Sequence, residues 1–175
     1  MAQAGAALGL GLKGDLGMPS FAGSVPAQAD GTAHAASMIG QGQVEASPLA
    51  MAVVAASIAR GQAVAPRLLQ GPASKTAKVD QQGGGPVTTG EAKELRAMMR
   101  AVVTEGSATF LGDVPGGAVA AKTGTAEYGT ADPPRTHAWM IAIQGDLAVA
   151  VFVEDGSSGS RTAGPILEQF LRGNT

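Results

Sequence analysis

The pattern of apolar and polar positions predicts a buried helix near the middle of the first half of the chain. Apolar residues occupy most positions from 47 to 60. Ser47 and Pro48 are typical of a helix start, because a serine hydroxyl caps free N–H groups and proline fits the first turn. Gly61 can end the helix in the left-handed conformation. Since the helix is apolar on nearly every side, we expect it to be buried.

A second predicted helix is amphipathic. Thr88 followed by Glu91 fits a capping box, in which each side chain bonds the backbone N–H group of the other residue. Behind this box, apolar residues recur at helical spacing with charged residues mostly between them, and the pattern ends near Gly106. The recurring apolar positions are Ala92, Leu95, Met99 and Val102. The pattern predicts a helix with one face on a core.

The last third of the chain changes to strand patterns. We expect strands at 119–128, 138–144 and 147–154, a loop at 155–160, and a closing helix at 162–171. Gly145-Asp146 forms a two-residue connection, and its glycine-first order favours a type II′ turn. Local hairpins indicate an antiparallel sheet packed against helices. The predicted fold class is therefore α/β, of the α+β type.

Glycine and proline punctuate the remaining segments. Residues 1–46 are predicted as a loop-rich lead-in, with the end of a helix at 2–8 and mainly loop at 9–37. Residues 75–86 are polar and then glycine-rich, which predicts another loop. The predicted organisation is a lead-in over 1–46, a helical part over 47–106, strands over 119–154 and a helix over 162–171.

The composition is that of a folded, nearly neutral chain. Hydrophobic residues make up 45% of the 175 residues and charged residues 15%, which excludes a charge-rich disordered chain. One domain is the default for this length. The formal net charge of −2 gives no sign of the clustered basic surface that nucleic-acid binding requires, so no nucleic-acid partner is expected.

No residue type points to a metal or a cofactor, and none is predicted. The chain has no cysteine and two histidines, His34 and His137, which excludes thiolate ligands and argues against a histidine-rich zinc site. The longest apolar run, 49–59, is shorter than the roughly 20 residues that a membrane span needs. The first eight residues contain no basic residue, so they do not resemble a signal peptide.

The most informative motif in the sequence is Lys122-Thr123-Gly124-Thr125. One alternative is a phosphate-binding loop, but that motif needs glycine before the lysine, where this chain has Ala121. A phosphate loop should also open a helix, whereas these residues lie within a strand pattern. The other interpretation is a binding site on the edge of a strand.

A strand edge with these residues suits an anionic ligand. Lys122 would bring a positive charge and Thr123 a hydroxyl donor, and Gly124 would leave room for close approach. The backbone N–H group of Thr125 would point at the recognised group. Such a set can combine carboxylate recognition with stabilisation of an oxyanion.

At this point the chain resembles the penicillin-binding transpeptidases, for which K-T-G is a known motif. The resemblance extends over about residues 39–154, in the order of the family's anchors. The matching stretches are Ile39-Gly40-Gln41-Gly42 (family I-G-Q-G), Ser47-Pro48-Leu49-Ala50-Met51-Ala52 (T-P-L-Q-M-A), Ala59-Arg60-Gly61 (A-N-G-G), Lys122-Thr123-Gly124-Thr125-Ala126-Glu127 (K-T-G-T-A-E) and His137-Ala138-Trp139 (H-A-W).

The resemblance implies a role for each residue of the tetrapeptide. Lys122 would tune the electrostatics of a cleft, and Thr123 would bond the terminal carboxylate of a D-Ala–D-Ala stem peptide or of a β-lactam. Thr125 would give its backbone N–H group to an oxyanion hole, and Gly124 would keep the edge clear. The implied fold is the C-terminal part of the serine transpeptidase/β-lactamase-like fold.

Two further motifs of that family are absent from the chain. No serine has lysine three places later, so the S-x-x-K nucleophile motif is missing. The S-x-N motif is missing too, because Asn174 is the only asparagine. An acyl-enzyme mechanism needs a nucleophile and a neighbouring base. We therefore predict no catalytic residue in this chain and no acylation of the chain alone.

Two hypotheses from different classes follow. In the first, residues 1–175 are the C-terminal part of a cell-wall D,D-transpeptidase domain, and the missing N-terminal part supplies the nucleophile, in the same chain or in a second one. By resemblance, such a protein works at the extracytoplasmic face of the cell membrane. In the second, the chain is a free-standing, non-catalytic module that binds muropeptides or β-lactams. A fragment of a related carboxypeptidase or serine β-lactamase is a variant of the first.

Several other polar or aromatic residues are predicted to be structural. His137 begins an apolar strand without an evident partner for catalysis, and Trp139 fits core packing. Glu154-Asp155 resembles a metal or acid pair but fits a solvated turn better. Glu127 and Asp132 are assigned no function.

Overall fold

The computed structural model describes residues 1–11, 16–27, 30–68, 85 and 87–174. The chain divides into two compact units, Met1–Ala92 and Lys93–Thr175. The boundary between them falls inside helix α4 (Thr89–Thr104). The loop predicted over 75–86 lies outside the described residues, apart from Gly85.

The first unit contains α1 (Ala2–Ala7), α2 (Gly31–Met38) and α3 (Pro48–Arg60). Helix α3 begins and ends as its sequence predicts. The Ser47 hydroxyl accepts a hydrogen bond of 3.1 Å from Ala50 N, and Gly61 closes the helix with φ +69°. The buried side chains of α3 are Ala50, Val53, Val54, Ala55, Ser57 and Ile58.

Helix α2 corrects the prediction of mainly loop over 9–37. It covers Gly31–Met38, and Ser37 is its buried residue. Ala33, Ala35 and Ala36 supply high helix propensity, but a helix that buries so little side-chain surface has no apolar stripe. The nearby glycines and prolines indicated a loop more strongly than the alanines indicated a helix. The loop prediction is wrong for this segment.

The capping box predicted at the start of α4 is present. Thr88 N donates to Glu91 Oε2 over 2.9 Å, and Glu91 N donates to Thr88 Oγ1 over 3.2 Å. The Thr88 hydroxyl also donates to Glu91 Oε2 over 2.7 Å. The hydrogen bonds from the side chain and backbone of Thr88 hold the pKa of Glu91 below its ordinary value. The box fixes the first turn of α4.

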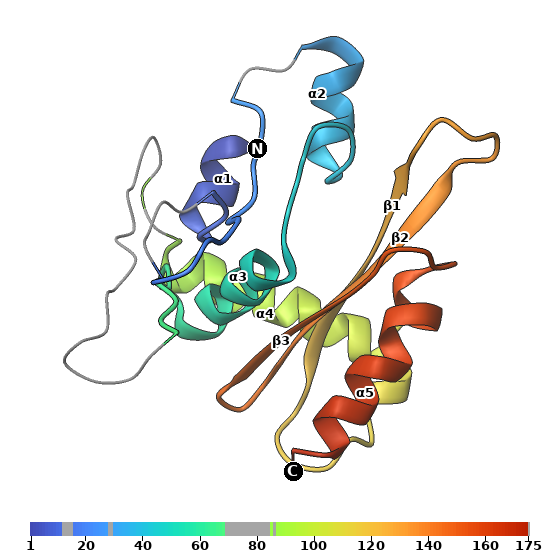
Figure 1. The fold of residues 1–175 in the computed structure, drawn as a ribbon. Helices are drawn as coiled ribbons and strands as arrows, with labels where there is room; N and C mark the ends of the chain where they lie inside the picture. Colours follow the sequence, from blue (N-terminus) through green and yellow to red (C-terminus); the bar gives the residue numbers. More distant parts are fainter. Residues whose placement is uncertain (12–15, 28–29, 69–84, 86, 175) are drawn as a thin grey trace. The chain divides into compact units, whose positions relative to one another are not determined.

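The second unit is built on an antiparallel sheet of three strands (Figure 1). The strands are β1 (Ala120–Tyr128), β2 (Arg135–Gln144) and β3 (Leu147–Val153), with β2 in the middle. Gly145 has φ +58° and Asp146 has a negative φ, which fits the predicted type II′ turn. The predicted antiparallel sheet packed against helices is confirmed.

Strand β2 begins earlier than its apolar pattern predicts. It starts at Arg135 rather than at residue 138, and Arg135, Thr136 and His137 pair with Tyr128, Glu127 and Ala126 of β1. These added pairs are mostly polar and lie toward the end of the hairpin. Alternation of apolar residues cannot find them, because the strand there is held by its partner rather than by burial.

The core of this unit lies on one face of the sheet, which we call the core face. Its residues on the strands include Ala121, Ala138, Met140 and Ala142, and Figure 1 shows α5 (Gly164–Arg172) running along the sheet. The residues that pack on the core face include Val103 of α4, Leu111 of the short helix η1 (Thr109–Leu111), and Leu167 and Leu171 of α5.

A π-helical turn, η2 (Gly159–Ala163), precedes α5. The loop predicted at 155–160 therefore ends sooner than expected, and the closing α-helix begins later than expected.

None of the helices in the part of the chain that the structure describes has both the length and the apolar character to cross a membrane.

Candidate functional site

The tetrapeptide Lys122-Thr123-Gly124-Thr125 lies in the middle of β1, in extended conformation. β1 is an edge strand, because the described strands pair with it on one side, through β2. Lys122 and Thr125 are exposed, and Thr123 and Gly124 are half-buried. The segment is therefore a strand edge that a ligand can reach, as the sequence predicts. The role of each residue stays a prediction.

Successive residues of the tetrapeptide point to opposite faces of the sheet. Thr123 and Thr125 pair with Met140 and Ala138, which belong to the core face. Lys122 and Gly124 point to the other face. The edge therefore offers hydroxyl groups on one side and an ammonium group beside a glycine on the other.

Hydrogen bonds hold the polar groups of this edge. Lys122 Nζ donates to the Thr123 carbonyl oxygen over 2.6 Å, so the ammonium group lies along its own strand. Thr123 Oγ1 lies 3.2 Å from Ser107 Oγ, and Gly159 N donates to Thr125 Oγ1 over 3.4 Å. Neither Ser107 nor Gly159 has a sequence signal for this role, because each reaches β1 across at least 16 residues of chain.

Gly159 brings the backbone of η2 directly against β1. A Cβ atom placed on Gly159 would lie 2.8 Å from both Gly124 N and Gly124 O, and even closer to the Trp139 carbonyl oxygen. On the other face, a Cβ atom on Gly124 would lie 3.2 Å from the Trp139 Cβ atom. Contacts this tight leave room only for glycine at position 159. At position 124 a Cβ atom would fit only if Trp139 moved slightly. They fix the backbone of β1 in the middle of the tetrapeptide.

The face that Lys122 and Gly124 share carries a row of rings, so we call it the aromatic face. Tyr128 and His137 stack with ring centroids 3.7 Å apart. His137 meets Phe152 edge-on at 5.1 Å, and Trp139 packs against Phe152 at 4.4 Å. Aromatic pairs at such separations are favourable. The prediction that Trp139 packs in the core is wrong, because the side chain is half-buried on the aromatic face, where it packs against Phe152.

His137 is held by a backbone contact as well as by its stacking. Its Nδ1 atom lies 2.7 Å from the Glu154 carbonyl oxygen. A carbonyl oxygen can only accept, so Nδ1 carries the proton in this contact. Both contacts fit the structural role predicted for this residue.

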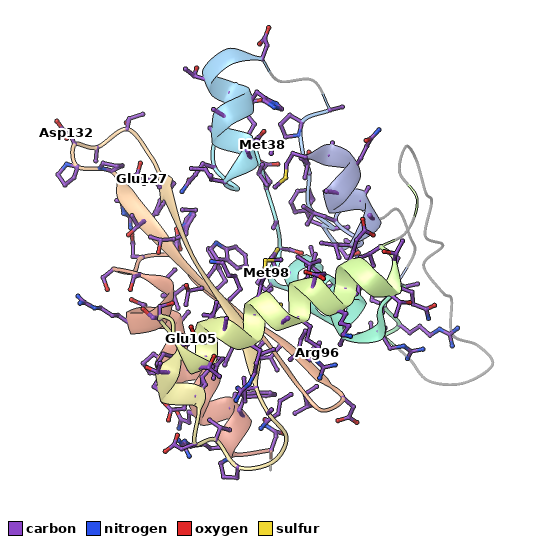
Figure 2. The ribbon with its side chains drawn as sticks, turned by 180° about the vertical axis from the view of Figure 1, so that it is seen from behind. Met38, Arg96, Met98, Glu105, Glu127 and Asp132 are labelled. Atoms are coloured by element: carbon purple, nitrogen blue, oxygen red, sulfur yellow. The ribbon has the colours of Figure 1, made fainter. Side chains whose placement is uncertain are left out.

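Asp155 joins the strand ends beside this histidine. Its Oδ1 atom accepts from the Tyr128 hydroxyl over 2.6 Å and from Arg135 Nε over 2.8 Å, and its Oδ2 atom pairs with Arg135 Nη2. Asp155 is therefore exposed, as predicted for a solvated turn, and in addition clamps the hairpin. Glu127 and Asp132 lie at the end of the β1–β2 hairpin (Figure 2).

Within the described ranges, no three histidine, aspartate or glutamate side chains gather in a way that could hold a metal ion.

Comparison with known proteins places the chain in one family. A family model for the penicillin-binding protein transpeptidase domain matches residues 1–172. The peptidoglycan D,D-transpeptidase PbpA of Mycobacterium tuberculosis (strain H37Rv) is 39% identical over 164 residues, covering 84% of this chain and 32% of the relative. PbpA of Mycolicibacterium smegmatis is 40% identical over 154 residues, covering 78% of this chain and 31% of the relative.

Solved structures agree with this similarity. The ceftriaxone acyl-enzyme complex of M. tuberculosis penicillin-binding protein A has a TM-score of 0.74 and 32% identity, over 95% of this chain and 41% of that chain. The penicillin-binding protein PBP2 of Helicobacter pylori, solved in complex with MreC, has a TM-score of 0.70 and 25% identity, over 96% of this chain and 33% of that chain.

The chain spans about a third of the length of the curated relatives that it matches. The family match nevertheless covers nearly every residue of it, from 1 to 172, and includes the strand edge with its K-T-G-T sequence. The chain belongs to the penicillin-binding protein transpeptidase domain family.

Proposed function

We propose that this chain is the C-terminal part of a peptidoglycan D,D-transpeptidase, and that residues 122–125 bind the carboxylate end of its substrate. The observation that carries the proposal is the placement of Lys122, Thr123 and Thr125 on an accessible edge strand. Thr123 would bond the terminal carboxylate of a D-Ala–D-Ala stem peptide or of a β-lactam. Lys122 would add positive charge, and charge-assisted hydrogen bonds are the strong ones.

Thr125 and Gly124 complete the proposed site. The Thr125 backbone N–H group would serve the oxyanion hole, where a fixed donor stabilises the charge that develops during acylation. Gly124 would let the substrate lie close to the strand. The tight contact of Gly159 with Gly124 supports this arrangement, because it fixes the backbone that would carry the donor.

The nucleophile belongs to a missing N-terminal part in this proposal. The chain has no S-x-x-K or S-x-N motif and spans about a third of its curated relatives. Helix α5 gives independent support. Ile166 and Phe170 are 50% and 45% exposed and lie one helical turn apart, on a different side of the helix from the buried Leu167 and Leu171. Such an apolar stripe is typical of a helix that further polypeptide covers.

We infer the substrate and the cellular location of this protein from its relatives. The curated relatives are named peptidoglycan D,D-transpeptidases, and M. tuberculosis penicillin-binding protein A has been solved as acyl-enzyme complexes with ceftriaxone and imipenem. We place this protein at the extracytoplasmic face of the cell membrane, where peptidoglycan is cross-linked.

Labelling with a fluorescent penicillin tests the proposal. The chain alone should show no covalent band after denaturing electrophoresis. A chimaera that joins the N-terminal part of M. tuberculosis PbpA, up to where its similarity to this chain begins, to residues 1–175 should be labelled. Thr123→Val in the chimaera should lower the labelling rate about tenfold or more, because a hydrogen bond to a charged group is lost.

Three results would count against the proposal. A covalent band on the chain alone would overturn the assignment of the nucleophile to another part. A chimaera that melts cooperatively but takes no label would overturn the transpeptidase assignment. Unchanged labelling of the Thr123→Val chimaera would overturn the carboxylate site.

A further inference from the structure

We propose that Ser107 is a positioning residue of the carboxylate site, and that its hydroxyl group sets the direction in which the Thr123 hydroxyl donates. The inference rests on the proposed function of Thr123. Ser107 Oγ lies 3.2 Å from Thr123 Oγ1, within hydrogen-bond distance. Ser107 is exposed and Thr123 half-buried, so a carboxylate can reach the pair from solvent.

The backbone around Ser107 is fixed on both sides. Ala108 N donates to the Val102 carbonyl oxygen over 3.0 Å, and the Ala108 side chain is fully buried. Gly106 makes the turn possible, because a Cβ atom there would lie 2.9 Å from the Val102 Cα atom. The hydroxyl of Ser107 is therefore held on a rigid turn between α4 and η1.

The two hydroxyl groups together offer one hydrogen to a ligand. A hydroxyl donates once and accepts twice, and one of the two hydrogens is used in the bond between Ser107 and Thr123. An ionised carboxylate can only accept. When the carboxylate binds Thr123, Ser107 must donate to Thr123 Oγ1, and the Thr123 hydrogen then points at the ligand.

The charge at this position favours the same ligand. Lys122 Nζ donates to the Thr123 carbonyl oxygen over 2.6 Å, which brings a full positive charge to the residue that carries the hydroxyl. Without Ser107, the Thr123 hydroxyl would lose the partner that orients it. The cost should appear with anionic substrates and should be small with neutral ones.

The test measures the second-order rate of acylation of the PbpA chimaera by benzylpenicillin and by its methyl ester, which has no ionised carboxylate. Ser107→Ala should lower the rate with benzylpenicillin about tenfold and change the rate with the ester less than about twofold. Ser107→Thr keeps a hydroxyl group and should stay within about twofold of the unchanged chimaera.

Thr104→Ala is the matched control. The Thr104 hydroxyl donates within α4, to the Arg100 carbonyl oxygen at 3.3 Å, and Thr104 lies three residues before Ser107. Its loss should leave both rates unchanged. In a chimaera that already carries Thr123→Val, Ser107→Ala should have little further effect, since the two residues act as a unit.

The possible outcomes separate this inference from the proposed function. An equal loss with the acid and the ester, or no loss in Ser107→Ala while Thr123→Val is impaired, overturns the role of Ser107 and leaves the proposed function intact. An unlabelled chimaera counts against the proposed function.

A second measurement then decides the role of Ser107 on the 175-residue chain itself. N-acetyl-D-alanyl-D-alanine is titrated against labelled protein, and the amide NMR signals of Thr123 and Gly124 are followed. Shifts in the unchanged chain and in Ser107→Thr that weaken severalfold in Ser107→Ala support the role. Shifts that are absent in the unchanged chain, or equal in all three proteins, overturn it.

Discussion

The strands present mostly small side chains on the core face of the sheet, with Met140 as the large exception, whereas the aromatic face carries the rings. On β2 the two kinds alternate. Ala138, Met140 and Ala142 are fully buried on the core face, while His137 and Trp139 are half-buried on the aromatic face. Small side chains let the backbone of η2 come close to the strands, as the contacts of Gly159 show. Close backbone contact gives this face its rigidity.

The difference bears on how the strand edge is held. The residues of the tetrapeptide that point to the core face, Thr123 and Thr125, both bond to groups outside the sheet. Lys122, which points to the aromatic face, bonds to its own strand. The core face therefore fixes the edge, and the aromatic face leaves Lys122 free of such external ties in the described contacts.

The largest effect should separate the two faces by stability. Met140→Ala removes a side chain that is fully buried and should lower the free energy of unfolding by about 2–5 kcal/mol. Phe152→Ala is the matched change on the aromatic face. Because Phe152 is 36% exposed, it should cost only about 1–2 kcal/mol. Urea denaturation of both variants measures the difference, and an equal or reversed order would contradict the division between the faces.

A smaller effect should follow from crowding the core face. Gly159→Ala places a Cβ atom 2.8 Å from Gly124 N, so the backbone must shift, at a cost of about 1–3 kcal/mol. Gly117→Ala is the control, since its Cβ atom would lie 3.7 Å from Gly145 N, an ordinary contact. The amide signals of Gly124 and Thr125 should move in the first variant and not in the second. If they stay in place in Gly159→Ala, Gly159 does not fix the strand edge.

The smallest effect should come from the exposed clamp beside the aromatic face. Asp155→Asn breaks the ion pair with Arg135. Because the side chains of Arg135 and Asp155 are 56% and 53% exposed, the change should lower the free energy of unfolding by less than about 1 kcal/mol. The loss should shrink at high salt, because exposed charges are screened. Asp132→Asn, in the hairpin loop, serves as the control in the same urea titrations. A salt-independent loss of several kcal/mol would show that the clamp is as important as the core.

Local signals were enough to predict much of this fold. The cap at Ser47, the box of Thr88 and Glu91 and the glycine-first turn at Gly145 each act within four residues, so the sequence states them directly. Helix α2 escaped prediction because it buries almost no side chain. The start of β2 at Arg135 escaped because cross-strand pairing, rather than alternation, defines it.

The same distinction applies to the site. The K-T-G-T sequence identifies the strand edge because its chemistry lies in consecutive residues. Ser107 and Gly159 could not be predicted, since a serine or a glycine has no special meaning until the fold brings it to Thr123 or Gly124. Contacts between distant segments depend on packing, which a single sequence does not state.

The alternation of side chains along β1 has a consequence for ligand length. A peptide that adds to this edge as a further strand would meet the same chemistry again only after sliding by two residues, because a slide of one residue exchanges the hydroxyl side for the ammonium side. The strand thus repeats its chemistry every two residues. A dipeptide is the shortest peptide end that spans one such repeat.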